Sequence, residues 1–141
     1  MTSLLIDDCE RLRMNKPVVK PEPPAPPKTV LIVDDEDACR ITTAWFLGNF
    51  GYTVSATRSA EEALELFDPA VHDVVLTDNS MPGISGIEMA HIIKLRSPAT
   101  LVVMYTGLAP ADQSCLDLVI QRPAHLLTLK EALDKLLAAR R

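Results

Sequence analysis

Short apolar segments alternate with longer segments of helical periodicity from residue 29 onward. The apolar segments cover residues 30–33, 52–56, 73–77, 100–105 and 117–120. Most of them are continuous rather than alternating, which is typical of strands that helices cover on both faces of a parallel sheet. The pattern therefore predicts an α/β fold in which five strands form a doubly wound sheet.

The segments between the apolar runs carry start and stop signals of helices. Ala38, Ile41, Trp45 and residues 47–50 predict an amphipathic helix whose apolar stripe faces the core and which ends at Gly51. A capping box, which is a hydroxyl residue followed three residues later by glutamate, predicts the start of each later helix. The pairs are Ser59 with Glu62, Ser85 with Glu88, and Thr128 with Glu131.

The crossover between the fourth and fifth strands is short. Only residues 106–116 separate the two apolar runs, and Pro110 lies among them. This length approaches the lower limit for connecting two parallel strands. We expect the fourth helix to be short or missing.

Residues 1–28 differ in composition from the remainder. Six of the eleven prolines lie between Pro17 and Pro27, which predicts an extended, semi-rigid spacer. The segment around Leu4 and Leu12 is too short to form a stable helix alone. We expect a flexible extension over residues 1–28, with a docking peptide as the alternative, and one folded domain over residues 29–141.

The overall composition restricts the classes of partner. A net charge of −5 argues against a nucleic-acid surface. No apolar run approaches the roughly 20 residues of a membrane span. The three cysteines, Cys9, Cys39 and Cys115, lack the spacing of metal ligands. We therefore expect a cytoplasmic protein with reduced thiols and with neither nucleic acid nor membrane as a partner.

Polar side chains follow four of the five predicted strands. Asp34 and Asp35 come after the first, Asp78 after the third, Thr106 after the fourth and Arg122 after the fifth. The carboxyl ends of parallel strands share one edge of the sheet, where sites of this class of fold form. Taken singly, each residue also suits an ordinary turn, a helix start or a surface position. Together they predict a site.

Three neighbouring carboxylates require a compensating cation. Mg²⁺ suits them because it prefers carboxylate, carbonyl and water oxygens. Asp78 then becomes a candidate nucleophile toward a phosphoryl group, while Arg122 and Thr106 could bind phosphoryl oxygens. The turn at residues 81–83 could direct the carbonyl of Ser80 inward.

These residues carry a family resemblance. From Lys28 to about Ala139 the chain resembles a response-regulator receiver domain of two-component signalling, on the motifs LIVDDED, VVLTDNSMPGISGIEM, VVMYTG and LVIQRP. The resemblance implies a CheY-like, flavodoxin-like sheet of order 2-1-3-4-5. It implies the following roles: Asp78 as phosphoacceptor; Asp35, Asp78 and the Ser80 carbonyl as Mg²⁺ ligands; Asp34 as a ligand through water; Thr106 and Arg122 as phosphoryl contacts.

Three departures from the family pattern fall in the C-terminal third. Arg122 replaces the usual lysine before proline, and a planar guanidinium is not equivalent to an ammonium group. Val119 occupies the position of an aromatic switch residue. The fourth helix is predicted to be short or missing. We therefore expect phosphorylation chemistry to be retained and the family's usual output surface to be altered.

Three hypotheses follow. The first is a stand-alone, non-enzymatic receiver that a histidine kinase or phosphotransfer protein phosphorylates on Asp78, and that signals to an unknown protein partner. The second is a degenerate receiver that binds proteins without phosphorylation. The third is a phosphatase similar to the haloacid dehalogenases, in which Asp35 attacks phosphate and Asp37 serves as acid or base. The chain would be short for that class, and the motif around Asp78 would be unexplained.

Overall fold

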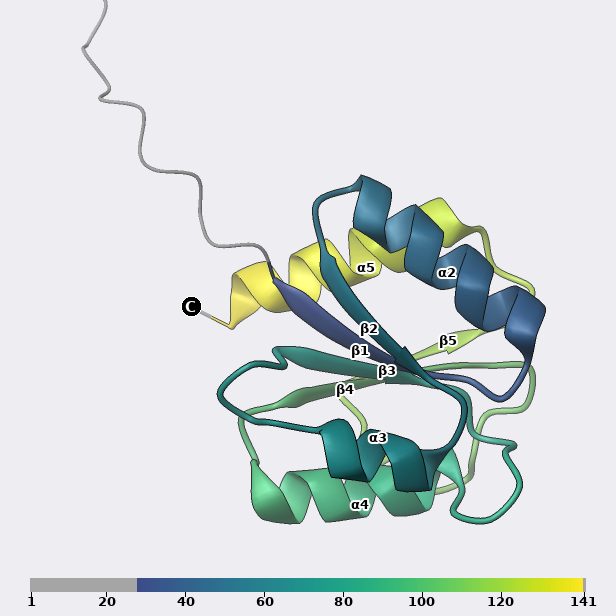
Figure 1. The fold of residues 1–141 in the computed structure, drawn as a ribbon, viewed down its shortest axis with the longest axis vertical. Helices are drawn as coiled ribbons and strands as arrows, with labels where there is room; N and C mark the ends of the chain where they lie inside the picture. The colour runs from purple at the N-terminus through teal and green to yellow at the C-terminus, as the bar shows by residue number, and fades with distance from the viewer. Residues whose placement is uncertain (1–27, 141) are drawn as a thin grey trace, which may run out of the picture.

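The computed structural model describes residues 28–140, which form a parallel sheet between two layers of helices (Figure 1). In chain order the elements are β1 (Thr29–Val33), α2 (Asp37–Asn49), β2 (Thr53–Thr57), α3 (Ala60–Leu66), β3 (Val74–Thr77), α4 (Gly86–Arg96), β4 (Leu101–Thr106), β5 (Leu118–Gln121) and α5 (Leu126–Ala139). Each strand lies within one residue of a predicted apolar segment, so the predicted α/β class is confirmed.

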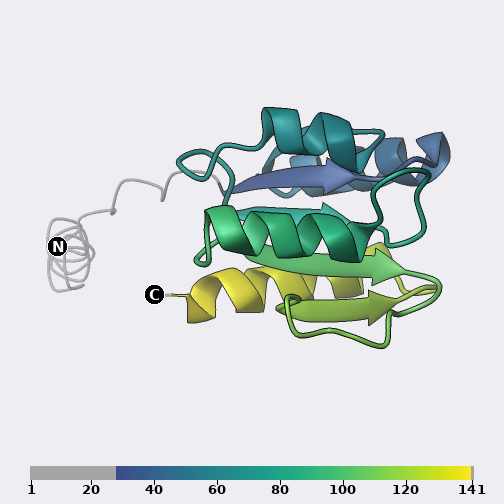
Figure 2. The same cartoon turned by 90° about the horizontal axis from the view of Figure 1, so that it is seen from below.

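The strand order is β2-β1-β3-β4-β5, as the resemblance implied. All pairings are parallel, and Val33 at the end of β1 lies beside Thr57 of β2 and Thr77 of β3. Toward the opposite edge of the sheet, Thr106 at the end of β4 lies beside Gln121 at the end of β5. Because the strands run in one direction, their carboxyl ends share one edge (Figure 2).

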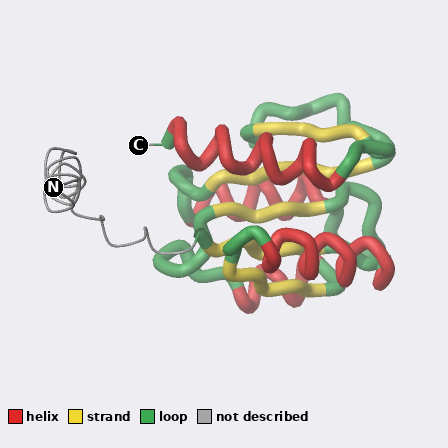
Figure 3. Tube along the Cα trace, turned by 90° about the horizontal axis from the view of Figure 1, so that it is seen from above, coloured by secondary structure: helices red, strands yellow, loops and turns green. Residues whose placement is uncertain are grey.

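Each face of the sheet has its own apolar core, with helices on both sides of the strand layer (Figure 3). Leu31 and Val33 of β1 face α3 and α4, whereas Val30 and Ile32 face α2 and α5. Successive side chains of each strand point to opposite faces, and both faces are covered by helices. The strands are therefore hydrophobic on both faces. The sheet is thus packed on both faces, and this packing fixes the positions from which the loops at its carboxyl edge begin.

The crossover from β4 to β5 contains no helix. Residues 107–117 form turns and bends, so the prediction of a short or missing helix at this crossover is confirmed. The crossover is fixed to the rest of the fold through Asp117, whose carboxylate accepts hydrogen bonds from Lys94 of α4 and from the backbone N–H of Val102, both at 2.7 Å. Side-chain contacts thus replace the packing of a helix.

Two of the three predicted capping signals are confirmed. The Ser59 side chain accepts the N–H of Glu62, and Ser85 forms a complete capping box with Glu88. The prediction for Thr128 is wrong, because α5 already begins at Leu126. His125 caps that helix by accepting the N–H of Leu127 on Nδ1, at 3.1 Å.

The expected core-facing stripe of α2 is right for Leu47, which is fully buried, and wrong for Ile41 and Trp45. The helix ends at the predicted place, before Gly51 with its φ of 93°. However, Ile41 and Trp45 are 62% and 70% exposed. The buried side of α2 carries Arg40, Thr43 and Leu47, and the guanidinium of Arg40 reaches the backbone just beyond β1, as described below.

The predicted extension over residues 1–28 lies outside the described residues, apart from Lys28, and the division of the chain at this point stays a prediction. Among the helices that the structure describes, none is long and apolar enough to cross a membrane.

Candidate functional site

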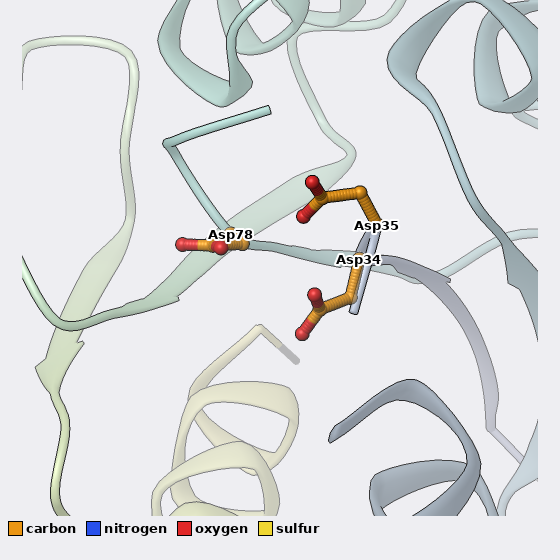
Figure 4. A group of neighbouring side chains, drawn as sticks. All are labelled: Asp34, Asp35 and Asp78. Carbon is orange, nitrogen blue, oxygen red and sulfur yellow. The ribbon is translucent and has the colours of Figure 1, made fainter. Parts of the chain in front are cut away.

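Three carboxylates gather at the carboxyl edge of the sheet. Asp34 and Asp35 follow β1 and Asp78 follows β3, and one oxygen of each lies within 4.8 Å of the others (Figure 4). Asp34 is buried, Asp78 is half-buried and Asp35 is exposed. The structure therefore brings together the three aspartates that the sequence predicted, in a cluster open to solvent on the side of Asp35.

The pairing of neighbouring strands fixes this arrangement. The backbone N–H of Asp34 donates to the carbonyl of Thr57, and that of Asp78 donates to the carbonyl of Val33, both at 3.1 Å. Each aspartate thus continues the hydrogen-bond pattern of the sheet by one residue beyond its strand. The cluster is a direct consequence of the register between β2, β1 and β3.

The loop after Asp78 is tied to the start of α4. Oδ1 of Asp78 accepts the N–H of Asn79 at 2.7 Å, and Asn79 in turn accepts the N–H groups of Gly86 and Ile87. A Cβ on Gly86 would lie 2.1 Å from the backbone oxygen of Asp78. Gly86 is thus part of the site, and sequence reasoning missed it. A glycine directly after the capping serine was the available signal.

Arg122 is held by three neighbours. Its Nη2 donates to Oδ2 of Asp34 at 2.7 Å, and its Nη1 lies 3.2 Å from Sγ of Cys39. The guanidinium stacks over the ring of Tyr105, with its carbon 4.5 Å from the ring centroid. The hydroxyl of Tyr105 donates to the carbonyl of Ala124 at 2.8 Å, so the same ring also fixes the backbone beyond Arg122. Sequence reasoning missed Tyr105 and Cys39.

The charges around this arginine keep it ionised. Burial acts to lower the pKa of Arg122, but the hydrogen bond and negative charge of Asp34, together with the charge of Asp78, raise it above its ordinary value. Burial raises the pKa of the Cys39 thiol, and the positive charge of Arg122 only partly offsets this. Arg122 is therefore a fixed cation beside the acidic cluster, and Cys39 is a neutral thiol at neutral pH.

A second arginine supports Asp34 from α2. Arg40 is only 7% exposed, and its Nη1 donates to the backbone carbonyl of Asp34 at 3.1 Å. Its Nη2 pairs with Asp37, in the first turn of α2, at 2.6 Å. Arg40 was also missed, because an arginine on an amphipathic helix normally lies on the exposed face.

Thr106 lies at the end of β4, where the sequence placed it. It is 1% exposed, and its hydroxyl has only weak contacts, at 3.4 Å to the backbone oxygen and nitrogen of Leu108. Hydroxyl hydrogen bonds are normally much shorter. The backbone carbonyl of Thr106 accepts the N–H of Arg122 at 2.8 Å, so the two residues adjoin across β4 and β5.

The donor set suits a hard divalent cation. Asp35 and Asp78 offer carboxylate oxygens of the kind that Mg²⁺ prefers, and the carbonyl of the exposed Ser80 follows two residues after Asp78. Both oxygens of Asp34 already accept hydrogen bonds, from Arg122 and from the N–H of Glu36. Asp34 thus has less free acceptor capacity than its neighbours, and its expected role as a ligand through water stays a prediction.

The family comparison agrees with this geometry. The family model of the response regulator receiver domain matches residues 30–139, which include every strand but the first residue of β1. The chain belongs to the response regulator receiver domain family. It is accordingly a receiver domain of two-component signalling rather than a relative of the haloacid dehalogenases.

Solved structures show the same fold. The response regulator TrrA of Thermotoga maritima, crystallised in complex with Mg²⁺-BeF, has a TM-score of 0.72 and 30% identity, covering 77% of this chain and 98% of that one. A CheY-like receiver domain from Methanospirillum hungatei has a TM-score of 0.76 and 27% identity, covering 81% of this chain and 96% of that one.

Curated relatives are longer proteins. A cyclic di-GMP phosphodiesterase of Thermotoga maritima is 33% identical over 108 residues, and FixJ, a transcriptional regulatory protein of Azorhizobium caulinodans, is 35% identical over 78 residues. These matches cover 72% and 55% of this chain, but only 29% and 37% of the relatives. The resemblance is therefore to one part of those proteins.

Proposed function

We propose that the chain is a phosphoacceptor receiver: a histidine kinase or phosphotransfer protein transfers a phosphoryl group to Asp78, and the phosphorylated chain signals by binding a protein partner. The main support is the cluster of Asp34, Asp35 and Asp78 at the carboxyl edge of the sheet, beside the fixed cation Arg122. The chain acts in this proposal as a signalling switch and not as an enzyme.

The transfer requires a nucleophile and a way to neutralise charge. A carboxylate oxygen of Asp78 bonds to the phosphorus, the N–P bond of the donor's phosphohistidine breaks, and the released imidazole takes up a proton. Asp35, Asp78 and the Ser80 carbonyl would hold Mg²⁺, with Asp34 acting through water, and the ion would neutralise the phosphoryl charge. TrrA, which was solved with Mg²⁺-BeF and also in complex with the histidine kinase ThkA, supports this assignment.

Arg122 and Thr106 are the proposed phosphoryl contacts. Arg122 has more N–H donors than its two partners use, and its Nε has no hydrogen-bond partner within the described residues. A guanidinium can therefore bind a phosphoryl oxygen with a second N–H while one remains on Asp34. The hydroxyl of Thr106, which has only weak contacts, can turn toward the same group.

The proposal is tested by incubating the chain with a small phosphodonor such as phosphoramidate, with Mg²⁺ or with a chelator, and measuring the intact mass. One added phosphoryl group is expected, and only with Mg²⁺. Asp78→Asn should prevent it. Asp68→Asn, a matched control in the loop after α3, should not. Labelling of Asp78→Asn would reject Asp78 as the acceptor. An unlabelled wild type would reject the proposal and favour the degenerate receiver.

A further inference from the structure

A thiol, an imidazole and a carboxylate lie in line where the β4–β5 crossover meets α4. Sγ of Cys115 lies 2.9 Å from Nδ1 of His91. The opposite ring nitrogen of His91, Nε2, lies 3.6 Å from Oδ2 of Asp112. The cluster is separate from the acidic site, and neither the proposed phosphorylation nor the packing of the sheet requires its chemistry.

Asp112 is oriented by its own loop. Its Oδ1 accepts the N–H of Ser114 at 3.0 Å and the hydroxyl of Ser114 at 2.7 Å, which directs Oδ2 toward His91. These hydrogen bonds lower the pKa of Asp112, so it is a carboxylate at neutral pH. A carboxylate beside one ring nitrogen favours the proton on that nitrogen. Nδ1 is then free to accept the S–H proton of Cys115.

The two half-buried thiols of the described chain differ in their surroundings. Cys115 faces a base, and the side chains of His91 and Asp112 beside it are 46% and 62% exposed, so small solutes can approach. Cys39 faces Arg122, which cannot accept a proton, and burial raises the pKa of the Cys39 thiol. Reactive cysteines are those that have a basic neighbour and remain accessible.

We propose that Cys115 is a thiol–disulfide exchange site for small disulfides of the glutathione class, with His91 as the base and Asp112 as the residue that positions it. The thiol proton moves to Nδ1 of His91, and Sγ bonds to one sulfur of the disulfide, whose S–S bond breaks. The departing thiolate takes the proton from the imidazolium. One thiol and one disulfide thus give one mixed disulfide and one free thiol, without any other oxidant.

The test uses the chain with Cys9 and Cys39 replaced by serine, so that Cys115 is its sole thiol. The probe is 5,5′-dithiobis(2-nitrobenzoate), a disulfide whose released thiolate is coloured, and oxidised glutathione serves as a second probe. Rates are measured from pH 5 to 9 for this chain and for His91→Gln and Asp112→Asn. Circular dichroism shows whether each variant is folded.

A matched control separates chemistry from loosening of the crossover. Lys94→Gln removes another polar side-chain contact between α4 and the crossover, the 2.7 Å pair with Asp117, without touching the thiol. If the Cys115 contacts only hold the crossover in place, His91→Gln and Lys94→Gln should have the same effect, which is faster reaction of a more exposed thiol.

The proposal predicts that His91→Gln slows the reaction at pH 7 about tenfold, because the loss of thiolate outweighs the gain in intrinsic nucleophilicity. Asp112→Asn should move the pH midpoint of the rate upward, and Lys94→Gln should leave that midpoint unchanged. Faster reaction in His91→Gln, or one pH profile shared by all variants, would overturn the proposal, as would failure of oxidised glutathione to form the mixed disulfide.

Discussion

Replacing Gly86 with alanine should disturb Asp78 from a position outside the acidic cluster. Gly86 is the first residue of α4, and the backbone of the Asp78–Asn79 loop passes directly over it. An added Cβ would lie 2.1 Å from the backbone oxygen of Asp78 and 3.0 Å from Cα of Asn79. Both neighbours are backbone atoms, so a change of rotamer cannot relieve the clash.

The size of the effect follows from these distances. Ordinary contacts of a Cβ begin at 3.4 Å, so the helix start and the loop must separate by about 1 Å. Forcing an extra methyl group into a packed region typically costs about 1–3 kcal/mol of unfolding free energy. A displacement of about 1 Å at a reacting group can cost about a hundredfold in rate. Gly86→Ala should therefore lower both stability and the rate of phosphorylation.

Gly48→Ala is the matched control. Gly48 lies in the last turn of α2, and nothing lies within 4 Å of the position that an added Cβ would occupy. That variant should gain about 0.5–1 kcal/mol, because alanine loses less conformational entropy in a helix. Urea unfolding gives the two free energies, and phosphoramidate labelling gives the rates. If Gly86→Ala were as stable as Gly48→Ala and were labelled as fast as the wild type, the close approach of α4 to Asp78 would be refuted.

Three further predictions concern individual contacts. Arg122→Met leaves the buried carboxylate of Asp34 without its cation and should lower the free energy of unfolding in urea by about 3 kcal/mol. Arg122→Lys should recover part of this loss, and an equal loss in both variants would show that the charge is unimportant. Ser85→Ala should lower the free energy of unfolding by about 1 kcal/mol because the helix cap is lost, whereas Thr128→Ala, which lies beyond the start of α5, should be nearly neutral. A larger loss for Thr128→Ala than for Ser85→Ala would show that Thr128 does cap a helix. Burial and a hydrogen bond to a carboxylate on α5 raise the pKa of Tyr52 above its ordinary value of 10.0. The unfolded chain then loses this proton first, so urea titrations should show wild-type stability falling relative to Tyr52→Phe above about pH 10, and parallel curves would contradict this.

The sheet and the acidic cluster could be predicted because their signals are local. A continuous apolar run ending in aspartate defines both a strand and the side chain at its carboxyl end, and parallel topology then brings Asp34, Asp35 and Asp78 together. The lack of a helix between β4 and β5 could also be predicted, since residues 106–116 are few for a crossover that contains one.

The residues that support the cluster could not be predicted in this way. Arg40, Tyr105 and Gly86 matter because of neighbours brought close by folding: the backbone of Asp34, the guanidinium of Arg122 and the backbone of Asp78. The same limit explains the error on α2. Ile41 and Trp45 fit an apolar stripe, but the helix is rotated so that Arg40 is buried instead. Periodicity alone cannot indicate which of two adjacent faces meets the sheet.

The most direct test of the central claim is to locate the phosphoryl group. The chain is treated with phosphoramidate and Mg²⁺, and borohydride then reduces the aspartyl phosphate to homoserine, which peptide mass spectrometry assigns to a position. The account predicts homoserine at position 78 alone, and none when Mg²⁺ is removed by a chelator. Homoserine at position 34 or 35, or an unmodified Asp78 in the presence of Mg²⁺, would contradict it.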